Sequence, residues 1–458
     1  MTEDAFLKRV SSFLLLHNYF VQVIKWSFSS IVGVSTTTTT TTTTTEVMSA
    51  VDWLDLPEHI LLVIAEKLFI NIKDYIRFGA VCPTWRSLYT QQHQTNFPPQ
   101  LPLLMLPSSE LLAVNDQQTC CIYDLLDKKI YNNFLLHLPA PHHQTYYRGS
   151  SHGWLISFTP TSPPVEAQLL NPFLSSSINL PPLTNFNYFI EQETEVIPYF
   201  FLYKVVLSAN PASNPNTCLV LAIFGAYCRL AFCKPGDNAW TCLELHPDSK
   251  NLPWQLRLKY RPCSLTEDII YFENKFYTVD SFGALWVIDF NAARPMLSNL
   301  LPPLDESQPS REYIYRHYVV QSSGHLFHVR RAWSYPVLDD YSYSTAKFEV
   351  FKLDQTCRKR VETKNLCGQM LFLGSNASMS LPASDYPGCM ANCIYFTDDF
   401  IEGYYHDDIT GVSPGPPDMG VFNLEDGSIE SHYQLRESRR FHPALIWIEP
   451  TPTVGKDG

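Results

Sequence analysis

The region from Leu101 to about residue 450 is a series of short strand-like runs separated by Pro, Gly, Asn and Asp. Short runs bounded by such residues are typical of strands joined by turns. Few stretches here have the 3.6-residue apolar period of a long amphipathic helix. Examples of the runs are residues 120–124, 153–159, 219–224, 228–233, 269–272, 275–280, 285–289, 318–321, 326–330, 348–353, 394–397 and 420–424. The pattern predicts an all-β sandwich, barrel or propeller.

The length of this region favours the propeller. Residues 101–450 are too many for one sandwich, and at ~40–50 residues per blade they would make about seven or eight blades, or fewer with long loops. A weak repeat supports this interpretation, because a strand ending in Asp or Asn recurs at residues 122–124, 169–171, 287–289, 351–354 and 421–423. No Trp-Asp or paired-Gly signature recurs, so the sequence does not indicate a clear WD or kelch propeller.

A helical pattern precedes this region, at residues 52–88. Pro57 suits the first turn of a helix, because its missing N–H needs no partner there. Asp55 and Glu58 have the spacing of a capping box, which is a second start signal. Apolar residues then follow at helical spacing, and these are Ile60, Ile64 and Leu68.

Two further helices are expected in the same stretch, at residues 73–81 and from Pro83 through Leu88. Three helices of this length cannot bury all of their apolar surface against one another, because small domains bury a low fraction of their surface. The excess of Leu, Ile and Trp therefore indicates that part of the surface contacts another protein. The alternative is a helical cap whose apolar residues face this protein's own core.

The ordered set of residues in this stretch resembles an F-box. The matching segments are Leu-Pro-Glu at 56–58, the first helix to Leu68, residues 74–78 and residues 80–86. The resemblance implies docking onto a Skp-type adaptor and, through it, onto a cullin ubiquitin ligase. The residues expected to bind the adaptor are Leu56, Pro57, Ile60, Leu61, Ile64, Leu68, Val81, Cys82 and Trp85.

The β region resembles the C-terminal domain of plant F-box proteins of the KIB type, which is described as F-box-associated or kelch-like. The matching segments are residues 153–155, 170–173, 180–183, 233–237 with Trp240, 275–280, 371–374, 392–399 and 420–427. The resemblance implies a β-propeller that recruits target proteins. The expected fold is therefore mainly β, with a small N-terminal three-helix F-box followed by a propeller-like domain of short antiparallel strands.

Five segments are expected along the chain. Residues 1–47 include ten consecutive Thr at 36–45 and are expected to be a disordered or spurious extension, because a homopolymer has no periodic apolar pattern. A weak membrane or organelle-targeting role is the alternative for this extension. The F-box is expected at 48–90, a linker at 91–100, the recognition domain at 101–450 and a tail at 451–458.

Charge and cysteine usage narrow the function classes. The formal net charge of −12 argues against a nucleic-acid partner, because phosphate binding needs a basic face. The 12 Cys are scattered without zinc-ligand spacing, and we interpret them as reduced thiols of an intracellular protein. No cofactor, metal or membrane association is expected, and the expected localisation is cytoplasmic or nuclear.

One acidic cluster could support chemistry. It comprises Asp398, Asp399, Glu402, His406, Asp407 and Asp408. Paired carboxylates can act as acid and base, so a hydrolase is one alternative. A solvated loop is the expected interpretation, because Asp commonly caps turns. His325 and His328 are expected on opposite faces of a strand, where they could not share a metal ion.

A loop at residues 331–345 is the expected target-binding element, because loops carry recognition residues and aromatic side chains supply much of the binding energy. The candidate residues are Trp333, Tyr335, Tyr341 and Tyr343. The alternative is that these rings pack inward. The predicted function is a non-catalytic substrate adaptor of an SCF-type ligase, with a hydrolase or a non-degradative F-box binding protein as alternatives.

Overall fold

The computed structural model describes most of the β region and parts of the helical region. The described residues are 56–68, 78–79, 81–92, 100–106, 120–126, 128–134, 146–158, 165–173, 176–183, 202–225, 228–243, 266–291, 295–304, 313–334, 343–399, 418–431 and 445–450. The expected extension at 1–47, the poly-Thr tract and the tail at 451–458 lie outside these residues.

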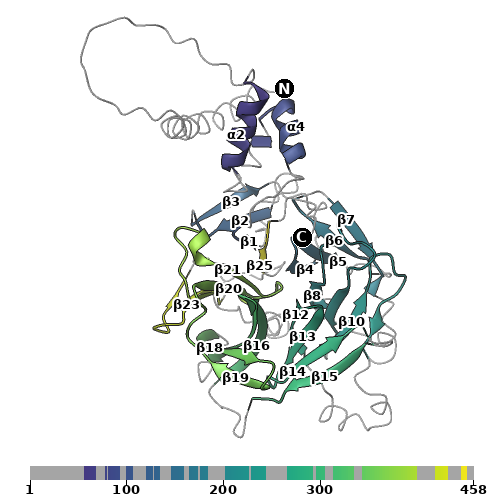
Figure 1. The fold of residues 1–458 in the computed structure, drawn as a ribbon, viewed down its shortest axis with the longest axis vertical. Coiled ribbons are helices and arrows are strands. Elements are labelled where there is room, and N and C mark those ends of the chain that lie inside the picture. The colour runs from purple at the N-terminus through teal and green to yellow at the C-terminus, as the bar shows by residue number, and fades with distance from the viewer. Residues whose placement is uncertain are drawn as a thin grey trace, which may run out of the picture. The chain divides into compact units, whose positions relative to one another are not determined.

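The described strands form six sheets arranged as the blades of a propeller (Figure 1). Blade 1 contains β1 (Leu103–Leu106), β2 (Cys120–Asp124), β3 (Lys129–Phe134) and β25 (Ile446–Ile448). Blade 2 contains β4 (Tyr146–Ser151), β5 (Trp154–Phe158), β6 (Ala167–Asn171) and β7 (Ser176–Leu180). Blade 3 contains β8 (Leu202–Leu207), β9 (Val220–Phe224), β10 (Arg229–Cys233) and β11 (Thr241–Cys242).

The second half of the ring follows the same plan. Blade 4 contains β12 (Thr266–Phe272), β13 (Lys275–Asp280), β14 (Leu285–Asp289) and β15 (Met296–Leu301). Blade 5 contains β16 (Tyr313–Ser322), β17 (His325–Ser334), β18 (Ser344–Asp354) and β19 (Lys359–Glu362). Blade 6 contains β20 (Gln369–Leu373), β21 (Met379–Pro382), β22 (Cys393–Phe396), β23 (Gly420–Asn423) and β24 (Ile429–Glu430), and a short 3-10 helix, η6 (Ala383–Asp385), follows β21.

The mainly β propeller predicted from the strand pattern and length is confirmed, and its six blades fall under the expectation of seven or eight blades, or fewer with long loops. The ring closes through the two ends of the β region. Strand β25 pairs antiparallel with β1, with Leu103 opposite Ile448 and Met105 opposite Ile446. Because the last strand completes the first blade, hydrogen bonds rather than a loop hold the two ends together.

Blades 2 to 5 are simple antiparallel meanders, and blade 6 departs from them. In blade 6, β20 pairs in parallel with β22, and β21 lies on the other side of β20. In sequence order, the second strand of this blade, β20, therefore precedes the innermost strand, β21. The connection between them, residues 374–378, contacts other blades, as the next section shows.

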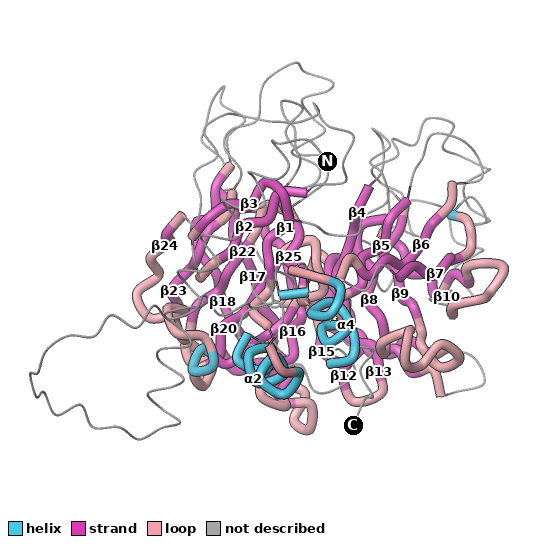
Figure 2. The backbone as a smooth tube through the Cα atoms, turned by 90° about the horizontal axis from the view of Figure 1, so that it is seen from above, coloured by secondary structure: helices cyan, strands magenta, loops and turns pink. Residues whose placement is uncertain are grey.

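One strand of each blade lies nearest the axis of the ring, and these are β25, β4, β8, β12, β16 and β21 (Figure 1). Neighbouring members of this set contact one another, as β4 does with β8 and β12 does with β16. Seen from the side, the strands run along the axis of the ring (Figure 2). The apolar cores lie between adjacent blades, for example Trp154 of blade 2 with Val205 of blade 3.

The helical region contains α2 (Glu58–Leu68) and α4 (Pro83–Gln92). Both begin where the sequence predicts, and α4 continues to Gln92, beyond the expected Leu88. Of the helix expected at residues 73–81, Phe78 and Gly79 are helical, while residues 73–77 and 80 lie outside the described residues. No helix of the described residues is long and apolar enough to cross a membrane.

Candidate functional site

Helix α2 is organised by Pro57. The carbonyl oxygen of Pro57 accepts hydrogen bonds from the backbone N–H of Ile60 (2.9 Å) and of Leu61 (3.2 Å). Glu58 adds an acidic side chain to the first turn, where it complements the helix dipole. The sequence Leu-Pro-Glu therefore fixes where α2 starts and so which residues share each of its faces.

Helix α4 starts in a comparable way at Cys82. The Cys82 Sγ atom accepts a hydrogen bond from the Trp85 N–H (3.5 Å), and the Cys82 carbonyl accepts one from the Arg86 N–H (2.9 Å). Cys82 thus occupies the N-cap and Pro83 the first helical position. The Arg86 Nε–H also donates to the Gly79 carbonyl (3.3 Å), which joins α4 to the helical residues before it.

A small apolar core lies between these helical residues. The Trp85 ring lies 4.7 Å from the Phe78 ring between centroids, and both side chains are buried. Helix α2 contacts α4. The buried apolar residues of this region are Leu61, Ala65, Leu68, Phe78, Trp85 and Leu88. Three of the nine residues expected to bind an adaptor, Leu61, Leu68 and Trp85, are therefore packed within this protein.

A second apolar face of α2 remains open. Ile60 is 40% exposed and Val63 is 42% exposed, and Pro57 is also exposed. These three residues are spaced at i, i+3 and i+6, so they follow one side of the helix. The remaining predicted adaptor-binding residues are half-buried, and these are Leu56, Ile64, Val81 and Cys82. Sequence reasoning missed Val63, although its spacing of three from Ile60 is the signal that identifies it.

The predicted target-binding loop is in part a strand. Trp333 lies on β17 and is 2% exposed, so its expected position in an irregular loop is wrong. Its ring packs edge-on to that of Tyr343, at 6.1 Å between centroids. Tyr343 donates its hydroxyl hydrogen to the carboxylate of Asp398, at 2.8 and 2.7 Å from the two oxygens. Tyr335 and Tyr341 lie outside the described residues.

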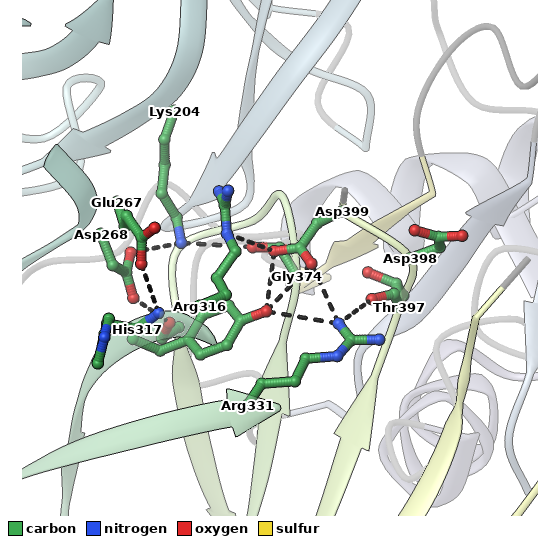
Figure 3. Close-up of polar contacts among 12 residues, drawn as sticks. Lys204, Glu267, Asp268, Arg316, His317, Arg331, Gly374, Thr397, Asp398 and Asp399 are labelled. Carbon is green, nitrogen blue, oxygen red and sulfur yellow. Dashed lines mark hydrogen bonds and ion pairs between the residues drawn. The ribbon is translucent and has the colours of Figure 1, made fainter. Parts of the chain in front are cut away.

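The carboxylates of Asp398 and Asp399 are buried (Figure 3). The expectation of a solvated loop is therefore wrong for these two residues. Asp399 forms an ion pair with Arg331 (3.1 Å) and a second with Arg316 (3.3 Å), and it accepts a hydrogen bond from the Tyr318 hydroxyl. The other acidic residues of the cluster, Glu402, Asp407 and Asp408, lie outside the described residues, as does His406.

Arg331 joins blades 5 and 6. Its Nη1 donates to the Thr397 carbonyl (2.8 Å), and its Nη2 pairs with the Asp418 carboxylate (3.0 Å). Burial alone would lower the pKa of Arg331, but Tyr318, Asp418 and Asp399 raise it above its ordinary value. The guanidinium is therefore charged, and its partners hold it in one position between the blades.

The environment of Arg331 favours its charged form, whereas the environment of Asp398 favours its uncharged form. Burial, and next the Asp418 carboxylate, raise the pKa of Asp398 to about 7. A group with this pKa could act as a general acid, but the Tyr343 hydroxyl and the Asp418 N–H already donate to its oxygens. Nothing in this geometry favours catalysis over a structural role.

A second buried network lies between the innermost strands (Figure 3). The Lys204 Nζ atom of β8 forms an ion pair with Asp268 of β12 at 2.5 Å and donates to the Gly374 carbonyl at 3.4 Å. The Ala377 N–H donates to the Ser150 carbonyl of β4 at 3.1 Å. The connection at residues 374–378 therefore reaches from blade 6 to blades 2 and 3.

His325 and His328 point to opposite faces of β17, as predicted, because His325 is exposed and His328 is buried. The Nε2 atom of His328 instead lies 2.9 Å from the Nδ1 atom of His317, at hydrogen-bond distance. The Arg360 Nε–H donates to His328 Nδ1 (3.1 Å). Burial, and next Arg330, lower the pKa of His317 to about 3, so this imidazole is neutral.

In the described parts of the chain, no group of three or more His, Cys, Asp or Glu side chains could hold a metal ion. Ile60 and Val63 on the open side of α2 are among the exposed large apolar residues of the described parts of the chain. This face, defined by Pro57, Ile60 and Val63, is called the α2 face below.

The chain matches the family model described as KIB1-4 beta-propeller over residues 122–423. It is 24% identical over 425 residues to the F-box protein SKIP23 of Arabidopsis thaliana, and the match covers 87% of this chain and 96% of that protein. It is also 24% identical over 398 residues to the F-box protein At4g35733 of the same plant, covering 84% of this chain and 97% of that protein.

Proposed function

The chain belongs to the KIB1-4 beta-propeller family, and from this premise we propose that it is a substrate-recognition subunit of an SCF-type cullin ubiquitin ligase. Its similar proteins are named F-box proteins and share most of its length. In this proposal α2 and α4 dock onto a Skp-type adaptor, and the propeller binds the target protein. The expected location is the cytoplasm or the nucleus.

The observation that carries the adaptor proposal is the α2 face. One side of α2 is already packed, since Leu61 and Ala65 are buried, while Ile60 and Val63 expose about two-fifths of their surface. Apolar residues that follow one side of a helix are the anchors by which a helix docks into a groove. We therefore place Pro57, Ile60 and Val63 at the centre of the adaptor contact, with Leu56, Ile64, Val81 and Cys82 at its edge.

In this role the protein needs no catalytic group. The propeller holds a target, and the adaptor and cullin hold the ubiquitin-charged enzyme. Joining the two sites in one complex raises the effective concentration of target lysines near that enzyme.

The target-binding role of Trp333, Tyr335, Tyr341 and Tyr343 stays a prediction. The burial of Trp333 supports a role in positioning Tyr343 rather than in direct contact.

The double substitution Ile60→Asp with Val63→Asp tests the adaptor proposal. Both side chains are exposed, so the protein should fold while losing its apolar contact with a purified Skp-type adaptor in co-elution by size exclusion. His59→Asp is the control for the effect of a carboxylate as such, because it puts one negative charge on an exposed neighbouring position of α2 without removing an apolar side chain. Co-elution of the double variant to the same extent as the control would defeat the proposal.

A folding control keeps the result interpretable. The melting temperature of the double variant should lie within a few degrees of that of wild type, because surface substitutions usually change stability by less than about 0.5 kcal/mol.

A target that accumulates when the proteasome is inhibited would support degradation. A bound target whose abundance is unchanged would favour the non-degradative alternative.

A further inference from the structure

Blade 5 contains longer strands than the other blades. Strands β16, β17 and β18 have 10, 10 and 11 residues, whereas the innermost strands of the other blades have three to seven. The His317 N–H of β16 donates to the Glu267 carboxylate of β12 (2.6 Å), and Val319 donates to Asp268 (2.9 Å), so the two strands run in the same direction. Because β12 begins one residue before Glu267, residues 313–316 of β16 extend beyond it.

The odd-numbered residues of β16 direct their backbone N–H and C=O groups away from β17. His317 and Val319 demonstrate this, because their N–H groups donate to side chains of β12. The register between β16 and β17 continues without a shift from Tyr313 to Ser322. Outward and inward groups alternate along a regular antiparallel strand, so the backbone N–H and C=O of Tyr315 also point to the inner edge of blade 5.

This inner edge is protected at His317 and Val319 and open at Tyr315. The two carboxylates of β12 occupy the outward N–H groups of the first two residues. In blade 3, the Arg148 Nε–H protects the start of β8 in a similar way, by donating to the Leu202 carbonyl (3.2 Å). In the described parts of the chain, the outward backbone groups of Tyr315 have no hydrogen-bond partner. An unpaired strand edge is a template on which another strand can pair.

The side chains next to this edge are those expected to contact a target. Ile314 is 47% exposed and lies on the opposite face of β16 from Tyr315. Trp333 lies directly opposite Ile314 on β17, and its ring packs against that of Tyr343. The open edge is therefore continuous with the predicted target-binding residues, and it is part of the innermost strand of its blade (Figure 1).

We propose that the open inner edge of β16 at Tyr315, called the β16 edge below, binds an extended segment of a target protein as an added strand. This inference rests on the proposed function, because it specifies how the propeller holds its target. One residue of the segment, the paired residue, exchanges backbone hydrogen bonds with Tyr315, as in other complexes formed by strand addition. Because side chains alternate along a strand, the residues next to the paired residue lie on the face of Ile314, where apolar side chains cover it.

Charge at this end of blade 5 selects neither a basic nor an acidic segment. The cations on or opposite β16, or against its Tyr rings, are Arg316, Arg330, Arg331 and Lys347. They pair with the carboxylates of Asp399, Glu349 and Asp418. Glu267 adds a fourth carboxylate. Four positive and four negative charges cancel, so the matching segment is uncharged, with an apolar residue on each side of the paired residue.

A pair of variants of the full-length protein tests the backbone contact. Tyr315→Pro removes the open N–H and leaves the ladder between β16 and β17 intact, because this N–H does not donate to β17. Tyr315→Ala is the matched control, because it loses the same ring and keeps the N–H. The probe is the fluorescein-labelled peptide Gly-Ser-Thr-Leu-Thr-Leu-Thr-Ser-Gly. Fluorescence anisotropy should show about fivefold weaker binding of the probe by Tyr315→Pro than by Tyr315→Ala, as expected for the loss of one hydrogen bond.

A second pair of variants tests the apolar contact. Ile314→Asn should weaken binding of the same probe at least threefold, because a Leu side chain of the probe no longer covers an apolar residue. Met296→Asn is the matched control, because Met296 is 63% exposed on β15 of blade 4 and should have no effect. Equal binding by these two variants would overturn the placement of the segment beside Ile314.

A third measurement needs no variant that could alter folding of the bound protein. In deuterated full-length protein labelled with 15N-tyrosine, the amide signal of Tyr315 is identified by its absence in Tyr315→Ala. The unlabelled peptide should move this amide proton downfield and slow its exchange with solvent, while the amide of Tyr271 on β12 stays unchanged. The control peptide has an N-methyl group on its central Thr, which removes the donor to the Tyr315 carbonyl, and should shift the signal at least fivefold less at the same concentration.

The results that would overturn the proposal are distinct. Equal binding by Tyr315→Pro and Tyr315→Ala, or equal shifts with the two peptides, would show that the backbone of Tyr315 is not the contact. A Tyr315 signal that does not respond to the peptide at millimolar concentration would mean that no such strand is added. A signal that depends on protein concentration and not on peptide would identify a second copy of the chain. None of these results changes co-elution with the adaptor, so failure here is distinguishable from failure of the proposed function.

Discussion

The Nζ atom of Lys204 lies 2.5 Å from the Oδ1 atom of Asp268, and both side chains are buried between the innermost strands of blades 3 and 4. The other carboxylate oxygen of Asp268 accepts hydrogen bonds from the Val319 N–H (2.9 Å) in blade 5 and from the Ser378 hydroxyl (2.7 Å) beside β21 of blade 6. One carboxylate therefore joins four of the six blades near the axis of the ring.

Replacing the lysine of this pair should destabilise the propeller strongly. Lys204→Met leaves the Asp268 carboxylate buried without its counter-ion, and breaking a buried pair in this way costs about 3–5 kcal/mol. The free energy of unfolding from urea titration measures the loss. Lys275→Met is the matched control, because the Lys275–Asp289 pair is 3.9 Å long and exposed, and such pairs contribute about 0–1 kcal/mol. Similar losses of unfolding free energy in the two variants would show that the buried Lys204–Asp268 pair stabilises the propeller no more than an exposed pair does.

Gly374 should tolerate no side chain. Its φ of +156° suits glycine, and a Cβ atom there would lie 2.0 Å from Thr397 Oγ1. Gly374→Ala must therefore rotate the buried Thr397 side chain or move the backbone of one of the two segments. Because overpacking of this kind costs about 1–3 kcal/mol or more, we expect a melting temperature well below that of wild type by differential scanning calorimetry.

Gly427→Ala is the control for Gly374→Ala. Gly427 has a φ of +74°, but a Cβ there would meet no atom within 4 Å, so the substitution adds backbone strain without a steric clash. The left-handed conformation costs about 1–2 kcal/mol for an L-residue. Gly374→Ala should therefore lower the melting temperature further than Gly427→Ala, and the reverse order would contradict the close packing of residues 374–378 against Thr397.

Asp398 should make stability depend on pH. Its pKa is raised to about 7 in the folded protein, mainly by burial, while an unfolded Asp titrates near ~3.9. The folded state therefore holds a proton that the unfolded state has released, so this contribution is full below pH ~4 and is lost as pH rises to about 7.

Asp398→Asn removes this titration and keeps an oxygen that can accept from the Tyr343 hydroxyl. The unfolding free energy of wild type minus that of the variant should fall as pH rises from about 4 to 7 and then become constant. Urea titrations at half-unit pH intervals measure this difference. A difference that is flat over this range would mean that Asp398 is ionised in the folded protein at all of these pH values.

The sequence predicts those features that depend on neighbouring residues. Leu-Pro-Glu at 56–58 and Cys-Pro at 82–83 fix the starts of α2 and α4, because capping acts within one helical turn. The short runs broken by Pro and Gly fix the β class. Pairing of β1 with β25 was not predictable, since the pattern of an individual strand does not specify a partner hundreds of residues away.

The burial of single residues was less predictable. Trp333 follows a strand-like run and precedes several Tyr residues, which favoured a loop, but β17 extends to Ser334 and carries Trp333 inward. Asp398 and Asp399 suggested a solvated turn. Arg331 supplies the charge that allows Asp399 to be buried. It lies 68 residues earlier than Asp399, and nothing in the local sequence reveals that partner. Polar networks between blades are set by tertiary packing, not by local pattern.

Amide hydrogen exchange of the full-length protein, with and without a purified Skp-type adaptor, tests most directly whether the α2 face is the surface that a partner covers. The account predicts that the adaptor slows exchange in peptides spanning α2 and α4 and leaves the strands of the six blades unchanged. Exchange in α2 that is the same with and without a saturating concentration of adaptor would contradict it, as would protection confined to the propeller.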